Sequence, residues 1–136
     1  MRIAVLLAVI AALVGCGAGA SASAADATNL KITFWPQGHE RGDAKTWTLR
    51  CDPNGGTLPK VAAACDKLGA LKAPFGRISP RAMCTEIYGG PQEAQIVGTF
   101  GGKRIWIALS AKNGCQISRA KKLGFLVPGF NTNPNA

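Results

Sequence analysis

The sequence has few of the side chains from which enzymes and metal centres are built. It contains one histidine, His39, and seven acidic residues in 136 positions. His39 stands in a glycine-flanked, turn-like segment, where a solvated side chain is the simplest interpretation. None of Ser79, Ser110 and Ser118 has a general base beside it, and no two cysteines have zinc-ligand spacing. These absences argue against an enzyme and against a bound metal or other cofactor.

The sequence also lacks the arginine-rich runs and aromatic motifs of nucleic-acid-binding proteins. Its 16 lysines and arginines give a net charge of +9, but they are scattered, and the only adjacent pairs are Lys103-Arg104 and Lys121-Lys122. Such a charge suits an exported protein that meets anionic surfaces. We expect no nucleic-acid partner.

Long apolar runs are missing except at the N-terminus. Ile3 to Val14 follows the basic Met1-Arg2 and is too short to cross a bilayer as a helix. This arrangement is typical of an export signal. We therefore expect residues 1–25 to form a signal peptide and flexible tether.

Two processing sites compete within this N-terminal segment. Leu13-Val14-Gly15-Cys16 resembles a bacterial lipobox, in which Cys16 is lipidated and becomes the first residue of the mature chain. The small residues Ser23-Ala24-Ala25 offer ordinary cleavage before Asp26 instead. The protein is then either secreted freely or attached to the membrane through a lipid anchor alone.

Four cysteines remain for the folded region once Cys16 is set aside. They are Cys51, Cys65, Cys84 and Cys115. Export implies an oxidising compartment, where cysteines pair, and four cysteines allow three pairings. One of them, the nearest-neighbour scheme, joins Cys51 to Cys65 and Cys84 to Cys115, which closes one short loop and one longer loop.

Alternation of apolar and polar residues predicts one β-hairpin, and two segments joined by a Gly-Gly turn predict a second. Residues 30–35 and 45–51 flank a polar turn, and residues 94–100 and 103–109 flank Gly101-Gly102. A last short strand is expected over 124–127.

Helical spacing of apolar residues predicts one helix after Thr57, which we expect to be its N-cap. A second, shorter helix is expected over 116–122. Together the elements predict a single α+β domain over 29–130, with a five-stranded antiparallel sheet, two helices and two disulfides. The polar residues 131–136 should be a disordered tail.

Arg81 to Pro91 is the stretch that the other elements are arranged to hold. Thr85, Ile87 and Tyr88 favour extended backbone, and glycines and prolines end the stretch. Cys84 could staple it to a rigid body. A stiff, protruding loop of this kind resembles a protease substrate, whereas the simpler interpretation is an ordinary surface loop with a structural cysteine.

Several motifs resemble the bacterial subtilisin inhibitor-like family of actinomycetes. The matching segments are Thr48 to Pro59, Ala64-Cys65, Met83 to Tyr88 and Val97 to Arg104, and Gly124 to Val127 matches less closely. The resemblance covers most of Leu30 to Val127. It implies a five-stranded antiparallel sheet with two helices, the bridges Cys51–Cys65 and Cys84–Cys115, and homodimers formed through the sheet.

The resemblance also implies a function. Members are secreted inhibitors of serine proteases, and alignment on Met83-Cys84 puts the reactive bond between Glu86 and Ile87. Met83, Cys84 and Thr85 would precede this bond in the protease-binding loop, and Tyr88 would follow it. The partners expected are subtilisin-like or glutamate-selective serine proteases.

The loop departs from the family pattern in two places. Glu86 stands where members usually carry methionine, lysine or another large residue. Gly89-Gly90-Pro91 replaces the usual Asp-Pro, and we expect the glycines to loosen this side of the loop. These departures favour the alternative of a non-inhibitory cell-surface binding or structural module on the same scaffold.

Overall fold

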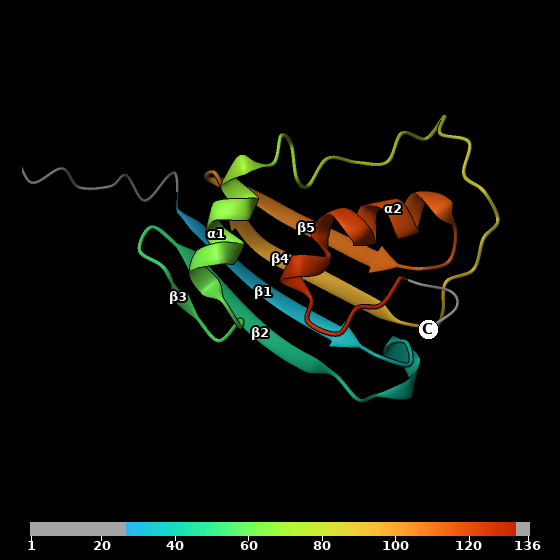
Figure 1. The fold of residues 1–136 in the computed structure, drawn as a ribbon, viewed down its shortest axis with the longest axis horizontal. Coiled ribbons are helices and arrows are strands. Elements are labelled where there is room, and N and C mark those ends of the chain that lie inside the picture. The colour runs from blue at the N-terminus through green and yellow to red at the C-terminus, as the bar shows by residue number, and fades with distance from the viewer. Residues whose placement is uncertain (1–26, 133–136) are drawn as a thin grey trace, which may run out of the picture.

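A computed structural model describes residues 27–132 as an antiparallel sheet covered on one face by two helices (Figure 1). The elements are listed in chain order: β1 (Thr28–Trp35), η1 (His39–Arg41), β2 (Lys45–Cys51), β3 (Gly55–Gly56), α1 (Val61–Ala70), β4 (Glu93–Phe100), β5 (Lys103–Ser110), α2 (Gly114–Leu123) and η2 (Gly124–Leu126). The strand order is β3-β2-β1-β4-β5. The predicted five-stranded α+β fold is thus confirmed.

The two hairpins form where the sequence predicted them. β1 pairs with β2 so that Leu30 lies opposite Leu49, and β4 pairs with β5 so that Ile96 lies opposite Ile107. The β4–β5 turn is Gly101-Gly102, and both glycines have positive φ (54° and 73°). Two successive positive φ angles are what a tight two-residue hairpin turn requires, and glycine adopts them without strain.

The core lies between the sheet and the helices, because the inward residues of each strand are apolar. Leu30, Ile32 and Phe34 of β1 are almost fully buried, while Lys31 between them is exposed. Leu68 of α1 and Leu123 of α2 cover the same face of the sheet. Within residues 27–132, no helix is long and apolar enough to cross a membrane.

Both predicted disulfides are present. Cys51 is bonded to Cys65 and Cys84 to Cys115. The first bridge ties α1 to the end of β2, and the second ties the segment before β4 to the first turn of α2.

Two local predictions are wrong. Thr57 does not cap α1, whose N-cap position is Lys60. Thr57 instead exchanges hydrogen bonds with Thr48, since its Oγ1 accepts from the Thr48 N–H at 3.0 Å and its own N–H donates to the Thr48 carbonyl at 3.0 Å. Thr57 therefore continues the short pairing of β3 with β2.

The segment 124–127 is not a strand. Residues Gly124–Leu126 form a 3-10 helix, and the fifth strand is β3. Leu126 and Val127 are both buried (0% and 1% exposed), whereas a strand on this sheet would put neighbouring side chains on opposite faces. Their joint burial in the core explains why a short apolar run was mistaken for a strand.

Candidate functional site

The predicted protease-binding loop is an exposed segment without helix or strand, between α1 and β4. Met83 is fully exposed (100%), and Ile87 and Tyr88 are 52% and 60% exposed. These are three of the four large apolar side chains that stand out as exposed in residues 27–132. Apolar side chains gathered in this way on one loop are typical of a surface that binds a partner.

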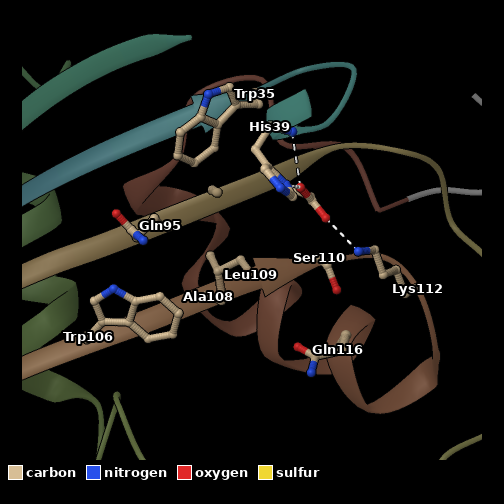
Figure 2. A pocket seen from close by; sticks show the side chains of 11 residues that line it. Trp35, His39, Gln95, Trp106, Ala108, Leu109, Ser110, Lys112 and Gln116 are labelled. Atoms are coloured by element: carbon tan, nitrogen blue, oxygen red, sulfur yellow. Dashed lines mark hydrogen bonds and ion pairs between the residues drawn. The ribbon is translucent and has the colours of Figure 1, made fainter. Parts of the chain in front are cut away.

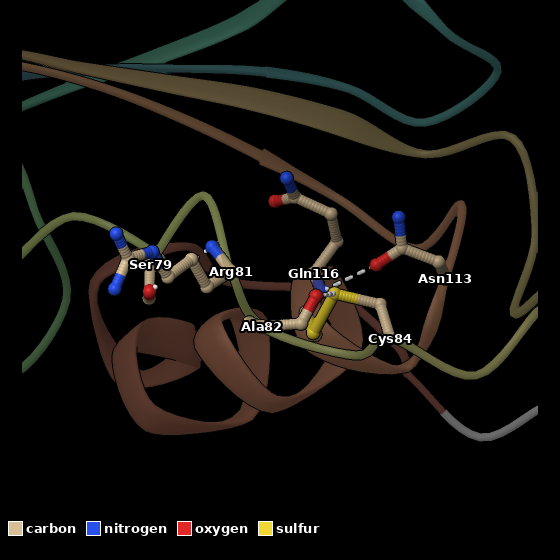
Figure 3. Close-up of a disulfide and its surroundings, with 7 residues drawn as sticks. Ser79, Arg81, Ala82, Cys84, Asn113 and Gln116 are labelled. Carbon is tan, nitrogen blue, oxygen red and sulfur yellow. Dashed lines mark hydrogen bonds between the residues drawn. A yellow bond between two sulfur atoms is a disulfide. The ribbon is translucent and has the colours of Figure 1, made fainter.

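The N-terminal side of this loop is fixed by a covalent bond and a hydrogen bond. The Cys84–Cys115 bridge brings the two Cα atoms to 5.2 Å, and the Gly114 N–H donates to the Thr85 carbonyl at 2.9 Å. Figure 3 shows the surroundings of this disulfide, where the Asn113 side chain accepts from the Gln116 N–H at 3.0 Å and caps α2. The loop is thereby attached to the start of a capped helix.

The C-terminal side of the loop is fixed as well, without a covalent bond. The Gly89 N–H donates to the Ala111 carbonyl at 2.7 Å, and the Gly89 carbonyl accepts from Gln92 Nε2 at 3.0 Å. Gly89 is buried, and a Cβ at this position would lie 3.1 Å from Ile117 Cδ1. The expectation that the glycines loosen this side is wrong at Gly89, because the missing side chain permits close packing.

Three residues between these fixed points stand free. Within the described chain, no hydrogen bond joins Glu86, Ile87 or Tyr88 to the rest of the protein. We call Glu86–Tyr88 the arch. Three of its flanking anchors, at Cys84, Thr85 and the Gly89 N–H, reach residues Ala111–Cys115. We call these residues, which follow β5 and include the first turn of α2, the support segment.

A charged cluster lies where the loop enters β4. Glu93 Oε1 lies 2.6 Å from Lys112 Nζ of the support segment. Glu93 Oε2 accepts hydrogen bonds from the His39 N–H at 3.1 Å and from the His39 imidazole (Figure 2). The cluster therefore joins the β1–β2 turn, the end of the loop and the support segment.

The electrostatics of this cluster favour an ionised Glu93. The hydrogen bond from Lys112, followed by that from His39, lowers the pKa of the Glu93 carboxyl from 4.5 to about 2. The hydrogen bond to Glu93 in turn raises the pKa of Lys112. His39 was predicted to be a solvated side chain; it is exposed, but it also holds Glu93 in place.

The face of the sheet opposite the helices carries a hollow of about 400 Å³. Trp35 and Trp106 line it on either side of Gln95, and His39 and Lys112 lie at one end (Figure 2). The Trp106 side chain is 64% exposed. This face is therefore open to solvent or to a partner.

Sequence reasoning missed several residues of the site, among them Gln92, Glu93, Ala111 and Lys112. One signal was available, because Gln92 continues the every-second-residue pattern of the buried Ala94 and Ile96 and must face inward with them. The partners of Glu93 and Ala111 are distant in sequence. Cys16, the signal peptide and residues 133–136 of the predicted tail lie outside the described residues.

Comparison with known proteins agrees with this architecture. The family model described as subtilisin inhibitor-like matches residues 17–113. The subtilisin inhibitor of Streptomyces violaceus is 35% identical over 74 residues, which are 52% of this chain and 50% of that protein. The chain thus matches about half the length of this curated relative.

A solved structure, Streptomyces caespitosus sermetstatin in complex with Bacillus licheniformis subtilisin, aligns with a TM-score of 0.49 and 25% identity. The alignment covers 76% of this chain and 99% of that one. Because the family model spans well over half of the sequence and the fold and both disulfides agree with the motifs, the chain belongs to the subtilisin inhibitor-like family.

Proposed function

We propose that this protein inhibits serine proteases by presenting the arch as a substrate, with Glu86–Ile87 as the reactive bond. The observation that carries the proposal is that the unanchored residues coincide with the predicted reactive bond. Cys84 and Thr85 are fixed on one side of that bond and Gly89 on the other. Family membership and the printed name of the Streptomyces violaceus relative support the same activity.

The arrangement favours tight binding and slow release of cleaved product. A loop held at both ends loses little conformational entropy when it enters a protease cleft, and its backbone can pair with the strands that line the cleft. If the protease serine attacks the Glu86 carbonyl, the new amine at Ile87 stays close to the acyl group. The bond can then re-form at high effective concentration.

Glu86 selects the target in this proposal. Its side chain is exposed, and the described residues place no cation in an ion pair with it. A carboxylate at this position is repelled by a protease pocket that carries an acidic residue and is disfavoured in an apolar pocket. It suits a pocket that carries a basic residue. We therefore propose a glutamate-selective or a subtilisin-like serine protease as the partner.

We also propose that the protein is exported, with Cys16 as a lipidation site. The lipobox-like segment and the even number of cysteines in the folded region support this proposal. Replacing Cys16 by Ser should release the protein from the membrane fraction into the medium. A wild-type protein found in the medium with Asp26 as its first residue contradicts it.

A homodimer through the open sheet face is the proposed assembly. The exposed Trp106, the neighbouring Trp35 and the hollow between them offer an aromatic surface for a second copy of the chain. Sedimentation should give a dimer for the wild-type domain and a monomer for Trp106→Lys. A monomeric wild-type domain at high micromolar concentration would be evidence against this assembly.

The test of the inhibitor function is a change of target through one residue. Glu86→Lys should create or greatly improve inhibition of trypsin, because the lysine can pair with the acidic residue of the trypsin pocket. The matched control is Asp66→Lys, which makes the same charge change at an exposed position on α1. If Glu86→Lys folds normally and leaves trypsin unaffected at high micromolar concentration, the non-inhibitory surface module becomes the better interpretation.

A further inference from the structure

Gln92 is unusual among the polar side chains of this protein. It is one of two polar residues that are buried in the described part of the chain, with 9% of its surface exposed. Its Nε2 donates to the Gly89 carbonyl at 3.0 Å and also to the Asn131 carbonyl. Because both acceptors are backbone carbonyls, this position requires a side chain that donates two hydrogen bonds.

We propose that Gln92 is a positioning residue for the leaving side of the arch, that is, the residues that follow the Glu86–Ile87 bond. It holds them in place after cleavage, so that this bond can be re-formed. This inference rests on the proposed inhibitory function. The Cys84–Cys115 bridge can hold only the acyl side of a cleaved loop, that is, the residues up to Glu86. The leaving side has no covalent anchor before β4, and its retention depends on non-covalent contacts at Gly89.

The length of free chain shows what this anchor does. With Gly89 fixed, the new amine of Ile87 is tethered by two residues, which reach at most about 7 Å. If Gly89 is released, the next fixed point is Glu93 at the start of β4. Six residues then separate the amine from the body, and they reach about 20 Å.

The rejoining step should respond to this change in tether length. The effective concentration of a tethered group falls roughly as the −3/2 power of the tether length, so that a change from two residues to six lowers it about fivefold. The acyl side is unaffected, because its disulfide is unchanged. Loss of the anchor therefore shifts the equilibrium towards cleaved protein without removing the loop from the surface.

Gly90 is matched to Gln92. It has a φ of 120°, and a Cβ at this position would lie 2.2 Å from Gln92 Oε1. The glutamine side chain thus occupies the space that a side chain at position 90 would need. The glycine that departs from the family pattern permits the anchor that Gln92 provides.

The experiment compares Gln92→Leu with wild type and with Gln37→Leu, a glutamine exposed in the β1–β2 turn. Each protein is incubated with catalytic amounts of subtilisin, and in parallel with a glutamate-selective protease, starting from pure intact and from pure cleaved protein. Mass spectrometry after reduction gives the ratio of cleaved to intact chains at equilibrium. Thermal melting reports stability separately, because a purely structural role would lower the melting temperature and leave this ratio unchanged.

We expect wild type and Gln37→Leu to share one ratio. Gln92→Leu should shift towards the cleaved form by up to about fivefold, since the Gly89 N–H can still donate to the Ala111 carbonyl. Gln92→Glu should behave like Gln92→Leu, because it keeps the size of the side chain but replaces the donor by an acceptor; it also serves if the leucine variant does not fold. An unchanged ratio in a folded Gln92 variant that still inhibits overturns the inference. A wild-type protein that neither protease binds or cuts at Glu86–Ile87 overturns the proposed function itself.

Discussion

Gly114→Ala tests whether the support segment sets the position of the arch. A Cβ at Gly114 would lie 2.1 Å from Thr85 Oγ1, where ordinary contact begins at 3.4 Å. Thr85 must therefore move by the difference of 1.3 Å or rotate its hydroxyl away. Either response disturbs the residue before Glu86, whose bond to Ile87 is the proposed reactive bond.

The expected effect is large on inhibition and small on folding. A misplacement of about 1 Å in a reacting group can cost about a hundredfold, and rotation of the hydroxyl should relieve part of the clash. We expect the inhibition constant for the target protease to rise about tenfold to a hundredfold. Gly114 is the first residue of α2, and alanine there favours the helix by up to about 1 kcal/mol, so that the melting temperature should not fall.

Competition assays at fixed substrate concentration measure this change. Gly69→Ala is the matched control, because it also lies in a helix and its Cβ would have no neighbour within 4 Å. In a Thr85→Ala background the nearest Thr85 atom, Cβ, would be 3.4 Å away, so that Gly114→Ala should have almost no further effect. A loss of inhibition that persists in that background would refute the proposed contact.

Two further predictions concern stability. Glu93 has a folded pKa of about 2 against an ordinary value of 4.5, so its contribution to folding stability is present above pH 4.5 and is lost as the pH falls towards 2. Over this range the melting temperature of wild type should fall more steeply than that of Glu93→Gln. Parallel curves for the two proteins would contradict the ion-pair assignment. Replacing both Cys51 and Cys65 by Ala should cost about 3 kcal/mol, the value for a loop of about 15 residues, measured by denaturant unfolding. Since this bridge lies at α1 and not at the arch, inhibition below the melting transition should be retained, and its loss would show that the two regions are coupled.

The regular elements could be predicted because their signals are local. Alternation in β1 and β2, and the Gly101-Gly102 turn between β4 and β5, are set by neighbouring residues. The disulfide pairing followed from the family resemblance. The lengths of the helices were less certain, and α2 begins at Gly114 and not at residue 116, because the Asn113 cap extends it by two residues.

The remaining features depend on contacts between distant segments. Thr57 looks like a helix cap, but the exposed edge of β2 offers it two backbone partners. Leu126 and Val127 look like a strand, but the core beneath α2 takes both side chains. Gly89 looks flexible, and only its packing against Ile117 and its bond to Ala111 show that it is fixed.

The dependence of the arch on a five-residue support segment has an evolutionary consequence. Because Glu86, Ile87 and Tyr88 make no hydrogen bonds to the body within the described chain, substitutions there carry little folding penalty. Selection for folding and selection for target choice therefore act on separate residues. Under the proposed function, single substitutions in the arch can change the protease that is bound without any change in Ala111–Cys115.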